Sequence, residues 1–387
     1  MRVLLLILCL GATVFANAET TAALFERAKQ ETDPTQKIKL LSDVISKSPQ
    51  HVGAYHNRAD AYLSLRRYPQ AIKDYNRVVA LRPKDPFRYY ARALAYNKMK
   101  QPSLALPDFS KAISLKPNYK NFYLERARTY AVLGKYGPSL EDYKTYSASL
   151  SKQPAPLLRE MIPVTLGAYR FDEAEALLSA LQAQGEDSAQ FYTWKGRVLQ
   201  NAGQLDEAIS FYSKAVNRKP EDPQAYRMRG NAFKELGDYE AALEDYTRSL
   251  ELEPEAYWFN RRGLTYEETK QFEKALQDYN KAVELDPRWA VAYNNRGYAK
   301  MYLKDFAGAK TDFETSIKLD PQAPTAYINL AGLYWLSKRD RKKMYEYLQK
   351  ALQHNFKNTE SLYDEDQKGW MFKNVNKTSE FRSLFYK

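Results

Sequence analysis

The chain has 387 residues, with 59 Lys and Arg against 47 Asp and Glu, which gives a formal net charge of +12. Its 3 His and 1 Cys argue against a metal centre built from nitrogen and sulfur ligands, and no nucleophile elbow or phosphate-binding glycine loop occurs. The sequence therefore predicts no catalytic, cofactor-binding or metal-binding residues, and an enzyme is the class it supports least.

Residues 1–18 have the layout of a secretory signal peptide. Arg2 gives a basic start, an apolar run follows it, and Ala16 and Ala18 are the small residues before a cleavage point. A membrane anchor is one alternative, but the apolar run is shorter than the roughly 20 residues that span a bilayer. A lipid-attachment signal at Cys9 is weaker, because the large Leu8 precedes it. We expect cleavage after Ala18 and an exported chain, either periplasmic or secreted, with no cysteine and no membrane-spanning helix after cleavage.

Residues 19–146 are predicted to form an N-terminal array of helix pairs, of which the first, up to Pro49, is irregular. From Val52 a set of aromatic, small and proline residues returns 34 residues later. The two series are Tyr55, Ala59, Tyr62, Ala71, Tyr75 and Pro83, then Tyr89, Ala93, Tyr96, Ala105, Phe109 and Pro117. Residues 147–188 keep this register poorly. We interpret them as a degenerate helical pair or a bend, and as the domain boundary.

Residues 189–354 contain the most regular repeats, and residues 355–387 break the period and predict a helical cap. The prolines and the small residues of the second helices both step by 34, 33 and 34 residues, which indicates a repeat array. They are Pro220, Pro254, Pro287 and Pro321, and Ala208, Ala242, Ala275 and Ala309. Each proline is expected to end the second helix of its pair, since it has no N–H and its ring clashes with the preceding turn.

A glycine stands inside the first helix of each of these pairs, four residues after an aromatic residue. The glycines are Gly196, Gly230, Gly263 and Gly297. Glycine inside a helix costs roughly 1 kcal/mol relative to alanine, so four equivalent glycines need a packing reason. We expect each to let the alanine of the second helix approach the first helix backbone. The aromatic residues one turn later are then expected to fill the groove towards the next pair; they are Tyr212, Tyr246, Tyr279 and Phe313.

This order of aromatic, glycine, alanine, aromatic and proline resembles the tetratricopeptide repeat family. The resemblance implies an all-α fold over nearly the whole mature chain, a right-handed superhelical solenoid of stacked antiparallel helix pairs. It also implies protein–protein interaction as the function, without identifying the partner.

The remaining face of the first helices predicts a peptide-binding groove. Arg227, Asn260 and Asn294 follow one another at intervals of 33 and 34 residues, so they would form a ladder across three pairs. Asparagine both donates and accepts hydrogen bonds, which suits the backbone of an extended peptide. The predicted groove residues are Arg227, Asn231, Asn260, Asn294, Tyr298, Tyr302 and Trp335. The alternative is that they are solvated or contact neighbouring repeats.

Charge is distributed unevenly along the chain. Residues 52–119 carry 13 Lys and Arg against 4 Asp and Glu, a net charge of +9, whereas residues 189–288 carry 15 against 18, a net charge of −3. A basic surface of this kind attracts anionic partners. The predicted anionic-partner residues are Arg66, Arg67, Arg88 and Arg92. The alternative is a basic surface that has no partner.

Two functional hypotheses follow. The first is an exported, non-enzymatic scaffold that binds a protein or an extended peptide in its concave groove, in envelope assembly or secretion. The second is an envelope-associated factor that binds an anionic polymer or membrane surface through its basic N-terminal repeats. Nucleic acid is the least favoured of the anionic partners, because the chain is expected to be exported.

Overall fold

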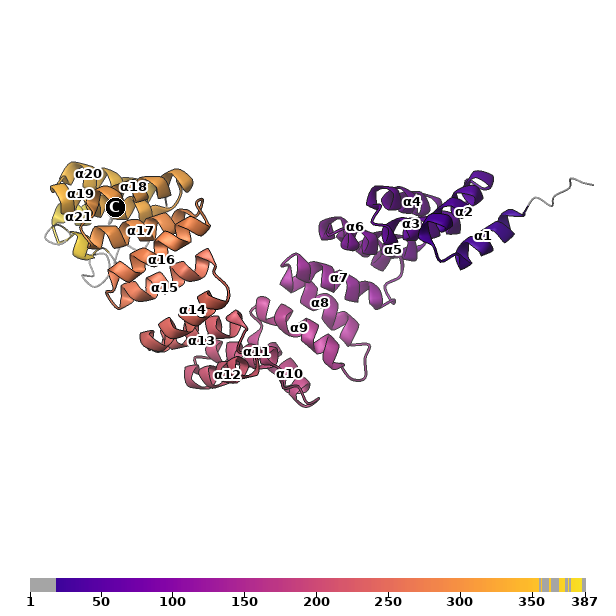
Figure 1. Cartoon of the computed structure of the whole chain (residues 1–387), viewed down its shortest axis with the longest axis horizontal. Coiled ribbons are helices and arrows are strands. Elements are labelled where there is room, and N and C mark those ends of the chain that lie inside the picture. The colour runs from indigo at the N-terminus through magenta and orange to yellow at the C-terminus, as the bar shows by residue number, and fades with distance from the viewer. Residues whose placement is uncertain are drawn as a thin grey trace, which may run out of the picture. The chain divides into compact units, whose positions relative to one another are not determined.

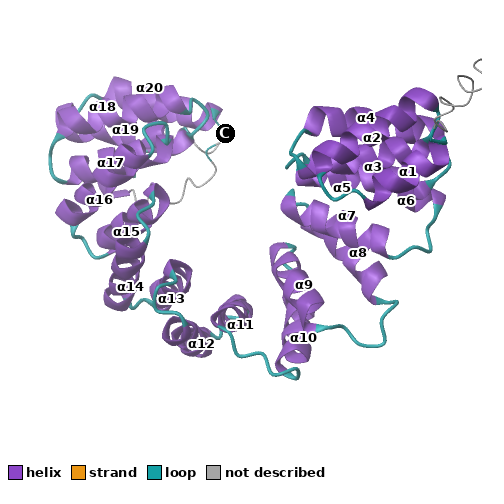
Figure 2. Cartoon of the chain, turned by 45° about the vertical axis from the view of Figure 1, so that its right-hand side comes forward, coloured by secondary structure: helices purple, strands orange, loops and turns teal. Residues whose placement is uncertain are grey.

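The computed structural model describes residues 19–354, 356, 362, 369–372, 375 and 377–384. Over this part of the chain every regular element is a helix, and consecutive helices are joined by short loops (Figures 1 and 2). The all-α fold of stacked helix pairs is therefore confirmed. The predicted signal peptide and much of the predicted cap lie outside the described residues.

The chain divides into two compact units, one ending at Gln184 and the other beginning at Gly185. Unit 1 contains α1 (Thr21–Gln30), α2 (Pro34–Lys47), α3 (Val52–Ser64), α4 (Tyr68–Leu81), α5 (Pro86–Lys98), α6 (Pro102–Leu115), α7 (Asn121–Val132), α8 (Tyr136–Ser147), α9 (Ala155–Gly167) and α10 (Phe171–Gln182). The poorly patterned segment 147–188 thus contains a helix pair, α9 and α10, and the division falls after this pair.

Unit 2 begins with α11 (Ala189–Asn201) and ends in two short elements. Its helices are α11, α12 (Leu205–Arg218), α13 (Pro223–Leu236), α14 (Tyr239–Leu252), α15 (Ala256–Glu268), α16 (Phe272–Leu285), α17 (Ala290–Tyr302), α18 (Phe306–Leu319), α19 (Pro324–Lys338), α20 (Arg341–Gln353), the 3₁₀ helix η2 (Gly369–Phe372) and α21 (Ser379–Ser383). Within the region predicted as a cap, Leu362, Met371, Phe372, Val375 and Phe381 are buried in one cluster with residues of α19 and α20.

We call the first helix of each pair helix A and the second helix B. Each helix B of α12, α14, α16 and α18 stops two residues before its proline, as at Leu285 and Pro287, so the predicted role of these prolines is confirmed. Some helices A begin with proline after an aspartate whose side chain accepts a backbone N–H, as Asp222 does from Gln224. Local sequence therefore defines both ends of these helices.

The packing partner of the helix A glycines differs from our expectation. A Cβ atom added to Gly263 would lie 2.7 Å from the ring of Tyr279, and one added to Gly196 would lie 2.6 Å from the ring of Tyr212. The glycine thus makes room for the aromatic side chain of its own helix B, and not chiefly for the alanine one turn earlier. The prediction that these rings also fill the groove towards the next pair is confirmed, since Tyr212 clusters with Ala232 of α13 and the ring centroid of Tyr246 lies 5.9 Å from that of Trp258 on α15.

A buried ion pair joins helix A to helix B at the same place in six pairs. In one of them the Nε and Nη2 atoms of Arg262 donate to the two carboxylate oxygens of Asp278 at 2.8 and 2.7 Å. Nη1 of the same arginine donates to Thr247 on the helix B before it, at 2.9 Å. The six pairs, each with arginine and aspartate 16 residues apart, are Arg58–Asp74, Arg92–Asp108, Arg126–Asp142, Arg229–Asp245, Arg262–Asp278 and Arg296–Asp312.

We call the turn from helix A to helix B the A–B turn. From the pair α3–α4 onward, every A–B turn contains a residue with positive φ. Glycine supplies it at Gly134, Gly203 and Gly237. Elsewhere the residues are Arg66, Lys100, Tyr169, Lys270, Lys304 and Arg339, with φ between 53° and 64°. A left-handed conformation costs a residue with a Cβ atom roughly 1–2 kcal/mol, so these cations and Tyr169 are locally strained.

We predict that Gly230→Leu lowers the free energy of unfolding by about 1–3 kcal/mol, because the new side chain must displace the ring of Tyr246, which lies 3.0 Å from an ideal Cβ atom. Urea denaturation followed by circular dichroism measures this change. Gly137→Ala is the control, since nothing lies within 4 Å of its added Cβ atom. Equal stability of the Gly230→Leu variant and the wild type would contradict the packing role of this glycine.

We also predict that Asp245→Ala destabilises unit 2 by about 3 kcal/mol, because it leaves the largely buried guanidinium of Arg229 without its carboxylate. Replacing both partners together, by Arg229→Met and Asp245→Leu, should restore most of this loss. The control on the same helix is Glu251→Ala, which removes an exposed ion pair with Arg248 and should change the urea midpoint much less. Equal effects of the two single substitutions would show that the buried pair has no special role.

Candidate functional site

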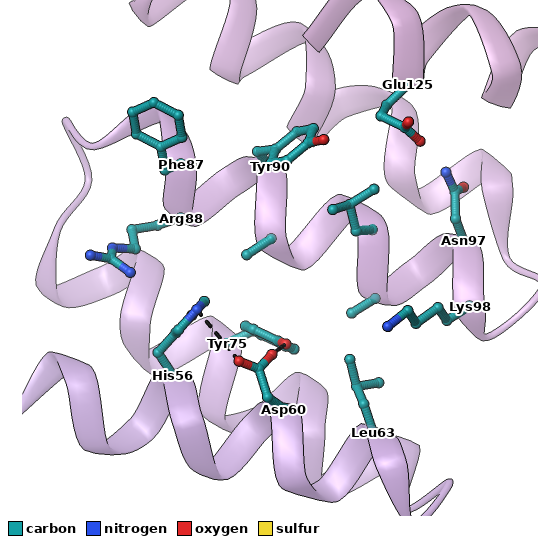
Figure 3. A pocket seen from close by; sticks show the side chains of 13 residues that line it. His56, Asp60, Leu63, Tyr75, Phe87, Arg88, Tyr90, Asn97, Lys98 and Glu125 are labelled. Atoms are coloured by element: carbon teal, nitrogen blue, oxygen red, sulfur yellow. Dashed lines mark hydrogen bonds and ion pairs between the residues drawn. The ribbon is translucent and has the colours of Figure 1, made fainter. Parts of the chain in front are cut away.

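We define the inner face of helix A by sequence positions counted from the arginine of the buried ion pair. Positions two residues before this arginine, two after it and five after it are His56, Asp60 and Leu63 on α3, and Tyr90, Leu94 and Asn97 on α5. All six residues line one pocket of about 660 Å³, together with Tyr75 from α4 and Glu125 from α7 (Figure 3). The pocket thus spans three successive helices A of unit 1.

The wall of this pocket is apolar and its ends are charged. Ala91, Leu94 and Ala95 line it from α5, and Leu63 faces them from α3. Arg88 and Lys98 lie towards opposite ends of the pocket, as Figure 3 shows. They are ten residues apart on one helix, which corresponds to about 15 Å along its axis.

The acidic groups of the pocket already have partners within the protein. Nε2 of His56 lies 3.6 Å from a carboxylate oxygen of Asp60, and the hydroxyl of Tyr75 donates to the other oxygen. Glu125 forms an ion pair with Arg128 at 2.5 Å. Among the cations Arg88 is paired with Asp85 at 2.9 Å, whereas Lys98 forms no ion pair with the described residues. The charge that remains available to a ligand is therefore positive.

The polar atoms of the pocket differ in their availability to a ligand. Burial raises the pKa of Tyr90 to about 12, so its hydroxyl stays protonated at neutral pH and can donate to a ligand, whereas the hydroxyl of Tyr75 already donates to Asp60. Neither Nδ1 of His56 nor Oδ1 of Asn97 has a hydrogen-bond partner in the described part of the chain. Both atoms are closed off from solvent in this structure, so they are not counted among the groups that a ligand in the pocket can reach.

The predicted groove residues of unit 2 occupy the same register, but they are buried. Arg227, Asn260 and Asn294 are 5, 4 and 8% exposed. Arg227 donates to Ser249 at 2.8 Å, forms ion pairs with Glu253 and Glu255, and lies 5.2 Å from the ring centroid of Trp258. These partners all come from the end of α14 and from the start of the next pair. The arginine thus fills space that is open in unit 1.

Asparagines connect three successive helices A in unit 2. Asn295 donates to Asn260 at 2.9 Å, Asn294 donates to Asn295 at 3.3 Å, and Asn329 donates to Asn294 at 2.9 Å. This chain of amides differs from the predicted ladder, because it includes Asn295 and Asn329 and leaves out Arg227, and its members bond to one another between the repeats. Burial of Asn260 and Asn294 does not support their direct contact with a peptide, and the alternative of inter-repeat residues describes them better.

The other predicted groove residues of unit 2 are partly buried and contact neighbouring side chains. Asn231 accepts a hydrogen bond from Tyr246 at 2.7 Å, and the ring of Tyr302 stacks on Phe272 with 3.8 Å between centroids. Tyr298 lies edge-on to Tyr302, and Arg339 lies 4.9 Å from the ring centroid of Trp335. Their role in peptide binding stays a prediction.

The four arginines predicted to contact an anionic partner lie in three different settings. Arg66 and Arg67 are exposed in the α3–α4 turn. Arg88 lines the pocket and is paired with Asp85, while Arg92 belongs to the buried ion pair with Asp108. The charge of Arg92 is thus neutralised by Asp108 inside the fold, so this arginine is not available to an anionic partner.

The described residues were also compared with the requirements of a metal site and of a membrane-spanning helix. No group of three or more His, Cys, Asp or Glu residues among them is placed to hold a metal ion. None of the helices over the described ranges has the length and apolar character needed to cross a membrane.

Comparison with known protein families gives matches along the chain. Models of the tetratricopeptide repeat match residues 52–85, 86–119, 165–232, 223–255, 256–288 and 290–323. The search of curated proteins gives no match.

Solved structures with a similar fold include a tetratricopeptide repeat protein from Parabacteroides merdae, which is 17% identical and has a TM-score of 0.53. The match covers 65% of this chain and 99% of that one. MamA from Desulfovibrio magneticus is 24% identical, with a TM-score of 0.41 over 44% of this chain and 96% of its own. YrrB, described as a TPR protein with an unusual peptide-binding site, is 23% identical, with a TM-score of 0.40 over 46% of this chain and 92% of its own.

Proposed function

Because the chain belongs to the tetratricopeptide repeat family, we propose that it is a non-enzymatic scaffold that binds an extended segment of another protein. The binding site in this proposal is the pocket on the inner face of α3, α5 and α7. Helix arrays of this family present such inner faces to protein partners, and the pocket is the observation that supports this role for unit 1.

The chemistry of the pocket defines the segment that fits it. The apolar wall formed by Leu63, Ala91 and Leu94 suits an aliphatic or aromatic side chain. The free ammonium of Lys98 suits a carboxylate beside that side chain, and the hydroxyl of Tyr90 suits a backbone carbonyl. We therefore propose an extended peptide with an apolar residue and an acidic residue a few positions apart.

We predict that a display library of random peptides, selected on the wild-type protein, yields sequences with this apolar and acidic pattern. Ala91→Arg should weaken the binding of a selected peptide at least about tenfold, because the long side chain occupies the pocket. Lys98→Glu should shift the selection away from acidic residues without affecting the fold, because Lys98 is exposed. Fluorescence anisotropy with labelled peptides measures both effects.

The matched control is Leu285→Arg, which introduces the same side chain at an exposed position of unit 2. It should leave peptide binding unchanged. Selected peptides that bind Ala91→Arg as tightly as wild type would place the binding site elsewhere. An unchanged sequence preference of the Lys98→Glu variant would contradict the role of this lysine.

We further propose that the scaffold acts after export, in envelope assembly or secretion, on the basis of the signal-like sequence of residues 1–18. N-terminal sequencing of the protein purified from its native host should begin at Glu19. A protein that retains Met1 would overturn this proposal, while the peptide-binding proposal would stand.

A further inference from the structure

The A–B turns of unit 1 carry an amphipathic edge. Successive pairs stack in the same orientation, so these turns lie along one side of the unit, and the ring of Tyr136 at the start of α8 packs beside Gly167 at the end of α9. We call this side the A–B edge. Its residues are Leu65, Arg66, Arg67, Lys98, Lys100, Leu104, Val132, Lys135, Tyr136 and Tyr169.

Exposed apolar side chains of unit 1 gather on this edge. Of its large hydrophobic residues that are exposed, all but Phe87 lie there: Leu65, Leu104, Val132, Tyr136 and Tyr169. Val132 and Tyr169 are the most accessible, at 76 and 77%. In unit 2 one exposed large hydrophobic residue, Leu236, lies at an A–B turn. The other four, Tyr257, Leu285, Val291 and Leu319, lie near the turns from helix B to the next helix A, on the other side.

Cations alternate with these apolar residues. Arg66, Lys98, Lys100 and Lys135 are exposed and form no ion pair within the described part of the chain, and Arg67 lies 4.8 Å from the ring centroid of Tyr62. The first turn of α10 adds Asp172 and Glu173, but Glu173 is paired with Lys144 and with Arg170. The edge therefore presents a positive surface around exposed apolar groups.

Local chemistry disfavours cations at several of these positions. Arg66 and Lys100 have positive φ, where glycine is preferred, a feature they share with Lys270, Lys304 and Arg339 of unit 2. Arg67 and Lys135 are the N-caps of α4 and α8, where they make no capping hydrogen bond and face the positive end of the helix dipole.

The same N-cap position in unit 2 is occupied differently. Asp238, Asp305 and Asp340 begin α14, α18 and α20, and each accepts a backbone N–H of its helix. The other two helices B of unit 2 begin after Gln204 and Gln271. In unit 1 only α2 has a capping aspartate, Asp33, and three of the other four helices B begin after a cation, namely Arg67, Lys135 and Arg170. Departures from local rules are expected where a surface serves a function.

We propose that the A–B edge of unit 1 docks on an anionic phospholipid bilayer. Val132, Tyr136 and Tyr169 would enter the headgroup region, where aliphatic and tyrosine side chains partition, while the cations contact lipid phosphates. A soluble polyanion would use the cations alone and would leave the apolar side chains in water. This interleaving of exposed apolar side chains with cations favours the bilayer, and the inference does not depend on peptide binding in the pocket.

Sedimentation with vesicles tests this inference. The protein should bind vesicles of equal parts phosphatidylcholine and phosphatidylglycerol, and not vesicles of phosphatidylcholine alone. The combined substitutions Arg66→Gln, Arg67→Gln and Lys100→Gln should weaken binding about 100-fold, because each cation near an anionic membrane contributes about 1 kcal/mol. Val132→Ser with Tyr169→Ser should weaken it at least about tenfold through loss of apolar burial.

Two controls match these variants. Arg82→Gln, Lys84→Gln and Lys116→Gln remove the same charge from the opposite side of unit 1, where Lys116 lies 4.9 Å from the ring centroid of Phe87. Leu285→Ser with Val291→Ser removes exposed apolar side chains from unit 2. Both controls should bind nearly as wild type. Three results would overturn the proposal. The first is that the wild-type protein does not bind the anionic vesicles. The second is an equal loss of binding in the two charge variants, and the third is unchanged binding of the Val132 and Tyr169 variant; either of these two would identify a general polyanion surface instead.

Discussion

The bidentate ion pair between helix A and helix B is the interaction on which the rest of the array depends. Burying a guanidinium and a carboxylate is costly unless both are fully hydrogen-bonded. Here Nε and Nη2 of each arginine bind both oxygens of the aspartate, and Nη1 reaches the preceding helix B, as Arg229 does to Ser213. One side chain thus fixes three helices, and a shift of one residue in any of them would leave a buried charge unpaired.

This interaction also explains the aromatic residues that define the repeat. The guanidinium of Arg262 lies 5.7 Å from the ring centroid of Phe259 and 5.9 Å from that of Tyr266, three residues before and four residues after it. Arg58, Arg126 and Arg229 lie between aromatic residues at the same two offsets. The rings shield the ion pair from water and leave the guanidinium edge free for hydrogen bonds. Aromatic, arginine and aspartate positions therefore form one structural unit.

The period, the helix ends and the stacked pairs could be predicted from the sequence, because they depend on residues that recur at fixed intervals. The packing partner of each glycine could not, since Ala208 and Tyr212 lie one turn apart on the same face of α12. The ion pairs were missed, although in six pairs an arginine directly precedes the helix A glycine or alanine and an aspartate directly precedes the helix B aromatic residue. The spacing of the repeats identified the positions that face the groove. It could not predict the burial of Arg227, because that burial depends on contacts with Glu253, Glu255 and Trp258 that do not follow from the repeat period.

The ion pairs also separate the two surfaces on which function is proposed. Because they fix the rotation of helix A, residues of one register face inward and line the pocket of unit 1. The A–B turns lie at the ends of the helices and are free to carry strained residues, since a conformation such as that of Arg66 persists where the surrounding structure holds it. Lys98 lines the pocket and also lies on the A–B edge. A bilayer at that edge would therefore compete for this lysine with an acidic peptide, which couples the two surfaces through one charge.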